Sequence, residues 1–272
     1  MNARSAFAIG LLAAACSHRP EPLATAPRIA VEAPPLPVAP APTEPAPIVE
    51  APPAKPPIVR RPGAYANLDP DDDYVLGPPE PYAGCEEELA AAGVKFRAAS
   101  IPVHTAPKAK FSCGAPQVVT YVSGPGKIAY NAQPVVTCAM ALALASFERI
   151  VQKEALDLFG SRVARIDQLG TYNCRVMSAY PTWVSEHSYA NAIDIGSFTL
   201  ANGKTVEVLR DFDVREAPPT KPAAAFLRAV SRRANDEDVF SHVLTPFFDA
   251  NHKNHFHLDL SRYRADGTRP SE

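Results

Sequence analysis

The sequence predicts an α+β domain, in which helices flank a mainly antiparallel sheet, preceded by a disordered proline-rich linker. Nineteen of the 30 prolines in the 272 residues lie at or before Pro81, so only the rest of the chain is expected to form a packed core. In that part, runs with helical periodicity are interspersed with short β-branched and aromatic runs. The two kinds of run do not alternate regularly, which favours α+β over a parallel α/β arrangement.

Residues 1–16 are typical of an export signal. The apolar run over residues 6–15 follows Arg4 and is too short to span a bilayer as a stable helix. It ends in "LAAAC", which resembles the processing box of bacterial lipoproteins, and this resemblance implies a lipid anchor on Cys16. Ser17 then implies retention at the outer membrane, on the periplasmic side of the envelope. The alternative is an ordinary cleaved signal with an incidental cysteine.

Residues 17–83 are predicted to form a Pro/Ala-rich tether. Between Arg19 and Gly63 the composition is that of an extended polyproline II chain, which at about 3.1 Å per residue reaches up to about 140 Å. The acidic run 69–73 and the turn-forming "GPPEPYAG" end this linker. A tether of this reach either lets the domain search the cell wall or only clears the membrane surface.

The charge balance does not favour nucleic acid as a partner. The chain has 27 Lys and Arg residues against 29 Asp and Glu residues, whereas binding of phosphate backbones needs a basic surface. We therefore expect no nucleic-acid partner, and we expect a monomer.

Three helices are predicted in the folded part, which we place over residues 84–266 with a tail at 267–272. A short helix begins near Cys85 and ends at Gly93. A long helix begins after Thr137, an N-cap residue, and ends at Leu158 or Phe159 before Gly160. A further helix covers residues 223–233. In the long helix, one apolar face is predicted to be core: Met140, Leu144, Phe147 and Val151.

Six short runs have the alternation or β-branched content of strands. They are residues 118–122, 162–169, 192–198, 205–209, 240–244 and 256–260.

Beyond Cys16 the chain has four cysteines, namely Cys85, Cys113, Cys138 and Cys174. An even number in an exported domain indicates two disulfides, and three pairings are possible. A zinc site built from these cysteines is disfavoured, because none of them has C-x-x-C spacing.

The segment "SEHSYANAIDIGSF" places His187 seven residues before Asp194. In a strand, Asp194 points away from the face that carries Ile193 and Ile195, and a buried carboxylate needs a partner. Imidazole and carboxylate are both ordinary zinc donors, so the two side chains are candidate ligands. This spacing alone is a weak signal.

The segment "NHKNHFHLDL" supplies three further histidines, His252, His255 and His257. In a strand, His255 and His257 point to the same face. A solvated polar turn is the alternative explanation for His252. Together the two segments supply three ligands for a zinc ion on the sheet and leave a fourth position for water, which is the pattern of catalytic zinc sites.

These motifs, with "LGTYNCR" upstream, resemble the extensin-like C-terminal domain family over residues 85–264. That family is similar to a wider group of zinc peptidases: D-alanyl-D-alanine carboxypeptidases, murein endopeptidases and lysostaphin-type enzymes. The resemblance implies that Zn²⁺ is held by His187, Asp194 and His257. It also implies that His255 activates water or stabilises an oxyanion, and that His252 is an active-site histidine.

Arg175 occupies the place where carboxypeptidases of this group bind the substrate carboxylate, although a surface arginine beside a disulfide is an equal alternative. Asn254 stands where those enzymes carry a glutamate base, so the base is expected to be His255. Ala190 replaces a common glycine. Asp259 is a candidate partner for a ligand histidine, and an ordinary aspartate at the end of a strand is an equal alternative. One family cysteine near residues 234–236 is absent.

The resemblance thus implies a zinc metallopeptidase that cleaves amide bonds in peptidoglycan. The alternative, favoured by the missing glutamate, is a non-catalytic zinc-containing envelope lipoprotein that binds peptidoglycan or has a structural role.

Overall fold

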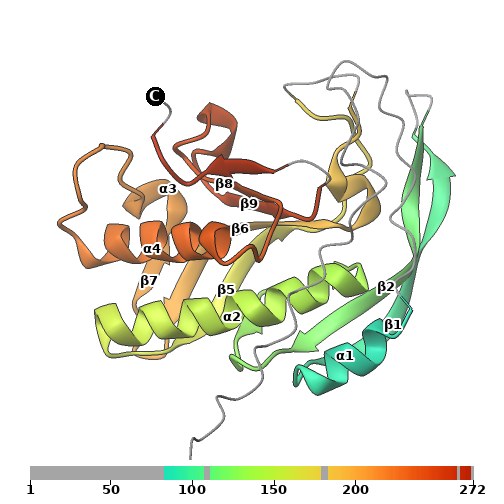
Figure 1. The fold of residues 1–272 in the computed structure, drawn as a ribbon, viewed down its shortest axis with the longest axis horizontal. Coiled ribbons are helices and arrows are strands. Elements are labelled where there is room, and N and C mark those ends of the chain that lie inside the picture. The colour runs from blue at the N-terminus through green and yellow to red at the C-terminus, as the bar shows by residue number, and fades with distance from the viewer. Residues whose placement is uncertain (1–82, 107–110, 179–182, 262–263, 271–272) are drawn as a thin grey trace, which may run out of the picture. The chain divides into compact units, whose positions relative to one another are not determined.

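The computed structural model describes residues 83–106, 111–178, 183–261 and 264–270 (Figure 1). The predicted signal, the lipidation site at Cys16 and most of the predicted tether lie outside the described residues. The described part is a mixed α+β domain with two sheets and four helices, and most strand pairs are antiparallel. The predicted fold class is therefore confirmed.

The smaller sheet has the order β1-β2-β4. Its long hairpin pairs β1 (Lys95–Thr105) with β2 (Ser112–Ser123), and β4 (Val135–Val136) pairs with the other edge of β2. The sequence indicated only the C-terminal half of β2, residues 118–122. β1 was not predicted, because as an edge strand it buries no side chain fully and shows no clean alternation.

The larger sheet has the order β10-β8-β9-β6-β5-β3, with β7 paired to β6. Among the described strands, only β3–β5 and β8–β10 are parallel pairs. Its strands are β3 (Ala129–Tyr130), β5 (Val163–Gly170), β6 (Ala192–Leu200), β7 (Thr205–Glu207), β8 (His242–Leu244), β9 (Phe256–Asp259) and β10 (Ala265–Gly267). The predicted strands 162–169, 192–198, 240–244 and 256–260 correspond to β5, β6, β8 and β9.

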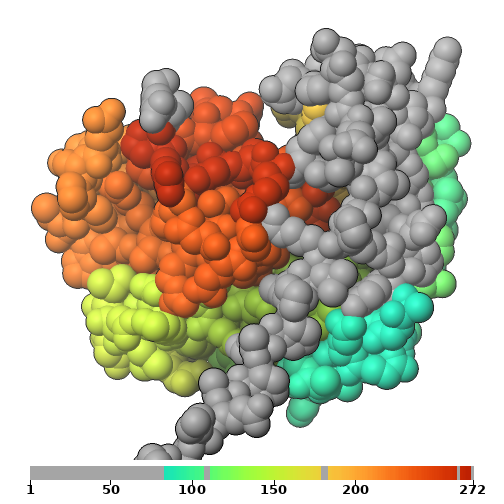
Figure 2. Space-filling view, in the orientation of Figure 1, coloured from blue at the N-terminus to red at the C-terminus, as the bar shows by residue number. Residues whose placement is uncertain are grey.

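The helices are α1 (Cys85–Ala91), α2 (Cys138–Phe159), α3 (Val208–Asp211) and α4 (Pro222–Asp236). α2 agrees with its prediction: the Thr137 side chain accepts a hydrogen bond from the Met140 backbone N–H, and Gly160 ends the helix with a left-handed φ of 60°. Its predicted core face is fully buried. α2 and α4 lie side by side (Figures 1 and 2). Both pack against strands of the larger sheet.

One predicted strand, residues 205–209, is only partly correct. β7 ends at Glu207, and α3 begins directly after it. The carboxylate of Asp211 accepts a hydrogen bond from the Glu207 backbone N–H at 2.9 Å, which favours a local turn over a longer strand.

Two disulfides join Cys85 to Cys138 and Cys113 to Cys174, which settles the pairing that the sequence left open. The first connects α1 to α2, and the second connects β2 to the loop that carries Arg175. Disulfides form and persist in oxidising compartments, so the domain is extracytoplasmic. Among the described residues, no helix combines the length and the apolar character needed to cross a membrane.

Candidate metal centre

The three predicted ligands are brought together where β6 and β9 pair. Asp194 on β6 lies directly opposite His257 on β9. His187 lies on a short 3-10 helix, Glu186–Tyr189, just before β6. Ala190 ends that helix with a left-handed φ of 54°, and it packs in a buried cluster with Ala115 and Val118.

The turn that carries His187 is fixed by the start of α2. Thr137 donates its backbone N–H to the carbonyl oxygen of Ala190 at 2.9 Å, and its hydroxyl donates to Asn191 Oδ1 at 3.0 Å. The Asn191 side-chain amide in turn donates to Leu260 O, beyond the end of β9. The N-cap residue of the longest helix therefore connects both segments that supply ligands.

The three ligand atoms form a nearly equilateral triangle. Asp194 Oδ1 lies 3.2 Å from His187 Nε2 and 3.0 Å from His257 Nδ1, and the two nitrogens are 3.2 Å apart. Exposed fractions of 19% for Asp194 and 12% for His257 leave the group reachable from solvent. His187, Asp194 and His257 are therefore a candidate metal-binding group.

The pKa values of Asp194 and His257 are shifted in opposite directions because the two groups interact. Burial raises the pKa of Asp194, but the neighbouring rings of His187 and His257 outweigh it and hold that pKa well below its usual range. Burial lowers the pKa of His257, but Asp194 and Asp259 outweigh it and raise the pKa to about 10. Two ring nitrogens and a carboxylate oxygen this close repel one another through their lone pairs, so either a proton or a cation has to lie between them.

Asp259 holds the ring of His257 in place from behind. Its Oδ2 accepts from His257 Nε2 at 2.8 Å and from His242 Nδ1 at 3.1 Å, and its Oδ1 accepts from the Ser261 backbone N–H. The proton on Nε2 leaves the Nδ1 lone pair of His257 facing the triangle. His242, Asp259 and His257 also meet the spacing for a metal group, but these hydrogen bonds account for their closeness.

The role of His242 was missed in the sequence. The signal that reveals it is strand pairing, because His242 on β8 lies directly opposite Asp259 on β9. His242 and Asp259 are seventeen residues apart in the sequence. The register that pairs them cannot be predicted from local periodicity.

His252 and His255 lie beside the ligand group. The ring centroid of His252 is 5.3 Å from that of His255 and 5.9 Å from that of His257. His255 Nε2 lies 3.5 Å from Asp194 Oδ1, although His255 precedes β9 instead of lying in it. Burial lowers the pKa of both His252 and His255, which favours the neutral form of both rings.

Arg175 lies on a segment that is tied to the helix carrying His187. Its backbone N–H donates to Ser188 Oγ, and its carbonyl oxygen accepts from the Ser185 backbone N–H. Its guanidinium donates to the carbonyl oxygen of Val176 at 3.4 Å. Binding of a substrate carboxylate by Arg175 stays a prediction.

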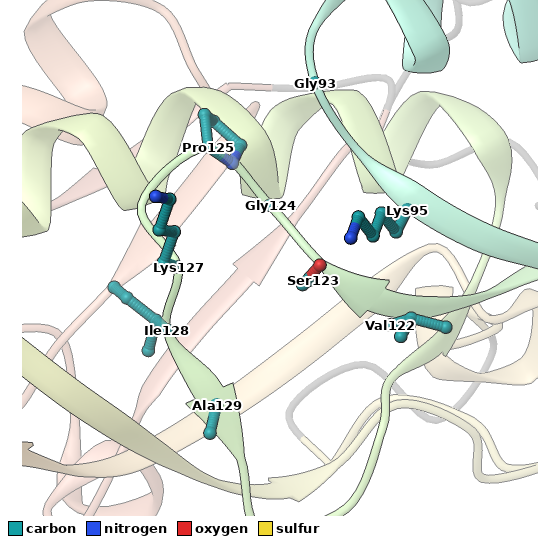
Figure 3. A pocket seen from close by; sticks show the side chains of 9 residues that line it. All are labelled: Gly93, Lys95, Val122, Ser123, Gly124, Pro125, Lys127, Ile128 and Ala129. Atoms are coloured by element: carbon teal, nitrogen blue, oxygen red, sulfur yellow. The ribbon is translucent and has the colours of Figure 1, made fainter.

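A pocket of about 440 Å³ lies elsewhere, between the starts of β1 and β3 and the end of β2, with Lys95, Ser123 and Lys127 among its lining residues (Figure 3). It contains none of the histidines.

His104, Cys113 and Cys174 form another group with metal-like spacing, but the two cysteines are joined in a disulfide and offer no thiolate.

Fold and site together define an extracytoplasmic α+β domain with a His–Asp–His candidate metal centre. Residues 83–269 match the family model described as "Extensin-like protein C-terminus". The chain belongs to this extensin-like C-terminal domain family. No curated protein and no solved structure matches the chain.

Proposed function

We propose that His187, Asp194 and His257 hold one zinc ion and that the domain is a metallopeptidase acting on amide bonds of peptidoglycan. The observation that carries the proposal is the triangle of ligand atoms, with sides of 3.0 to 3.2 Å. Tetrahedral zinc bonds of about 2.0–2.1 Å place neighbouring ligand atoms about 3.3 Å apart. The triangle is close to that size before any ion draws the side chains together.

The donor set favours zinc over the hard cations. Two imidazole nitrogens and one carboxylate oxygen are typical of catalytic zinc sites, whereas calcium and magnesium prefer oxygen ligands. The group contains three side chains among the described residues, so one tetrahedral position stays available to water or substrate. When bound, zinc would polarise a carbonyl group and lower the pKa of water.

The neighbouring histidines supply the remaining chemistry in this proposal. Burial lowers the pKa of His255, which favours the neutral ring, and its Nε2 lies 3.5 Å from Asp194 Oδ1. Nε2 can therefore take a proton from the attacking water, and the protonated ring can then donate to the oxyanion. Asn254 cannot replace the glutamate base of related enzymes, but its Oδ1 accepts from His255 Nδ1 at 2.9 Å. Asn254 therefore orients the His255 ring, which would act as the base in place of a glutamate.

Peptidoglycan is proposed as the substrate because the domain is extracytoplasmic and resembles wall peptidases. Arg175 would bind a carboxylate of the stem peptide. We further propose that the mature protein is a monomer anchored to the outer membrane through a lipid on Cys16. A non-catalytic zinc module that binds peptidoglycan is the second candidate, and Asn254 in place of a glutamate favours it.

Digestion of peptidoglycan distinguishes the two candidates. The zinc-loaded full chain is incubated with purified peptidoglycan, and soluble fragments are analysed by mass spectrometry, with His257→Ala as control. Fragments released only by the wild-type chain identify a peptidase and its bond. Co-sedimentation with the wall without fragments contradicts the peptidase and supports the binding module.

A further inference from the structure

His252 is held by a carboxylate that takes no part in the ligand group. Its Nδ1 lies 2.6 Å from Asp249 Oδ1, the shortest hydrogen bond that any of the clustered histidines makes in the described part of the chain. Asp249 is 31% exposed and His252 is 15% exposed, so water screens this bond only partly.

The other histidines of the cluster are held differently. Both ring nitrogens of His257 are engaged, one by the ligand group and one by Asp259. His242 shares that same Asp259 carboxylate. His255 is oriented by the neutral amide of Asn254. His252 is thus the histidine with a carboxylate of its own behind Nδ1.

Packing fixes the plane of the His252 ring as well. The ring lies edge-to-face with Phe248 at a centroid distance of 5.6 Å, and the rings of His255 and His257 lie beside it. A carboxylate behind Nδ1 keeps the proton on that nitrogen, so Nε2 carries the lone pair.

We propose that Asp249 is the positioning residue for His252: it fixes the Nδ1–H tautomer and presents Nε2 as a hydrogen-bond acceptor for the substrate or its attacking water. This proposal rests on the proposed peptidase function and refines it, because it adds His252 to His255 as a second histidine whose Nε2 can accept a hydrogen bond. Asp249 acts through His252 and does not touch the ligands.

The competing explanation is that Asp249 only caps a turn. Its Oδ1 also accepts from the backbone N–H groups of Asn251 and His252, at 2.8 and 3.1 Å, at the start of the 3-10 helix Ala250–His252. Serine can replace aspartate as such a cap but is too short to reach the imidazole. Asp249→Ser therefore separates the two roles.

The first test is ¹⁵N NMR of the histidine rings in the zinc-loaded full chain. The wild-type chain should show His252 protonated on Nδ1, and Asp249→Ser should shift that proton to Nε2 in a large fraction of molecules. Asp213→Ser is the matched control, because Asp213 also accepts from the backbone N–H two residues on but contacts no histidine. A wild-type His252 protonated on Nε2 overturns the proposal whether or not the protein cleaves peptidoglycan.

The second test is kinetic. Asp249→Ser should lower kcat for peptide release by about 10-fold to 100-fold with little change in KM, as is typical for residues that orient active-site histidines. In a His252→Ala background the same change should have no further effect. Equal losses in both backgrounds, or an unchanged kcat, would show that Asp249 is only a cap. A wild-type chain with the expected tautomer but no activity would contradict the peptidase function and leave the positioning role supported.

Discussion

At the scale of single residues, the candidate site depends on how each ring nitrogen of His257 is engaged. Nε2 donates to the buried carboxylate of Asp259, and Nδ1 faces His187 and Asp194. The backing carboxylate selects the tautomer in which Nδ1 can donate its lone pair to a cation. The same carboxylate partly neutralises the charge that a bound cation would bring.

Removal of one ligand should abolish stoichiometric zinc. His257→Ala leaves two donors, which are too few to retain zinc through gel filtration, and His187→Ala should behave alike. Metal content per chain, measured by mass spectrometry, provides the readout. His104→Ala is the control, because that exposed ring contacts Tyr172 and none of the ligands. Full zinc content in His257→Ala would contradict the ligand assignment.

Loss of the His255 side chain should lower kcat without changing the zinc content. His255→Ala is expected to keep one zinc per chain and to lower kcat by about 100-fold or more, the usual contribution of a proton-transferring side chain. Zinc content and rate of peptide release are measured on the same preparation. Wild-type turnover in the variant would end the proposed role of His255.

At the scale of elements, local signals predicted some features well and others not at all. α2 carries its own boundaries in Thr137 and Gly160 and its own apolar face, so short-range rules suffice. The two-residue strands β3 and β4 carry no such signal, because they are defined by pairing with β5 and β2. The same holds for β1, whose side chains remain largely exposed.

A buried carboxylate connects α2 to the strands that it packs against. Glu148 is fully buried and accepts hydrogen bonds from the hydroxyl groups of Tyr121 and Tyr130 and from the Gly126 backbone N–H. Burial raises the pKa of Glu148 to about 7, although these hydrogen bonds lower it in part. The folded chain therefore binds this proton more tightly than the unfolded chain does.

Glu148 should make stability depend on pH between about 4.5 and 7. Its raised pKa means that the free energy of unfolding falls as pH rises through this window, by up to about 3 kcal/mol. Glu148→Gln removes the titrating group, so the slope should flatten even if the variant is less stable overall. Urea unfolding at several pH values measures the slope. Equal slopes in the two proteins would contradict the predicted pKa.

At the scale of the whole molecule, the site joins segments that are far apart in the sequence. The spacing of histidine and aspartate indicated the two segments, and the family resemblance implied His187, Asp194 and His257 as the ligands. These three side chains do converge. Two neighbouring contacts were not predicted: that of His242, which shares the Asp259 carboxylate with His257, and that of Asp249 with His252. His242 is recognisable only from the β8–β9 register, and Asp249 only from the turn that brings it onto His252.

The disulfide that joins Cys113 to Cys174 should contribute strongly to global stability. It closes a loop with a sequence separation of 61 residues, and such loops are expected to stabilise by about 4 kcal/mol. The double variant Cys113→Ser, Cys174→Ser should unfold at correspondingly lower urea concentration. A midpoint equal to that of the wild-type chain would show that the cross-link constrains little of the unfolded state.

The proposed lipid anchor on Cys16 would determine where the whole protein is located. Cys16→Ser should release the protein from the membrane fraction and abolish labelling with a lipid precursor, because a single cysteine is the predicted attachment point. Labelling that persists in the variant would place the lipid on another residue, and an unlabelled wild-type chain would support the ordinary cleaved signal.

The central claim is that His187, Asp194 and His257 hold one zinc ion with a fourth position open. X-ray absorption at the zinc edge of the purified full chain tests it most directly. The account predicts one zinc per chain with two imidazole nitrogens, a carboxylate oxygen and one further oxygen at about 2.0–2.1 Å. Absence of zinc, sulfur neighbours at about 2.3 Å or a third imidazole would contradict it.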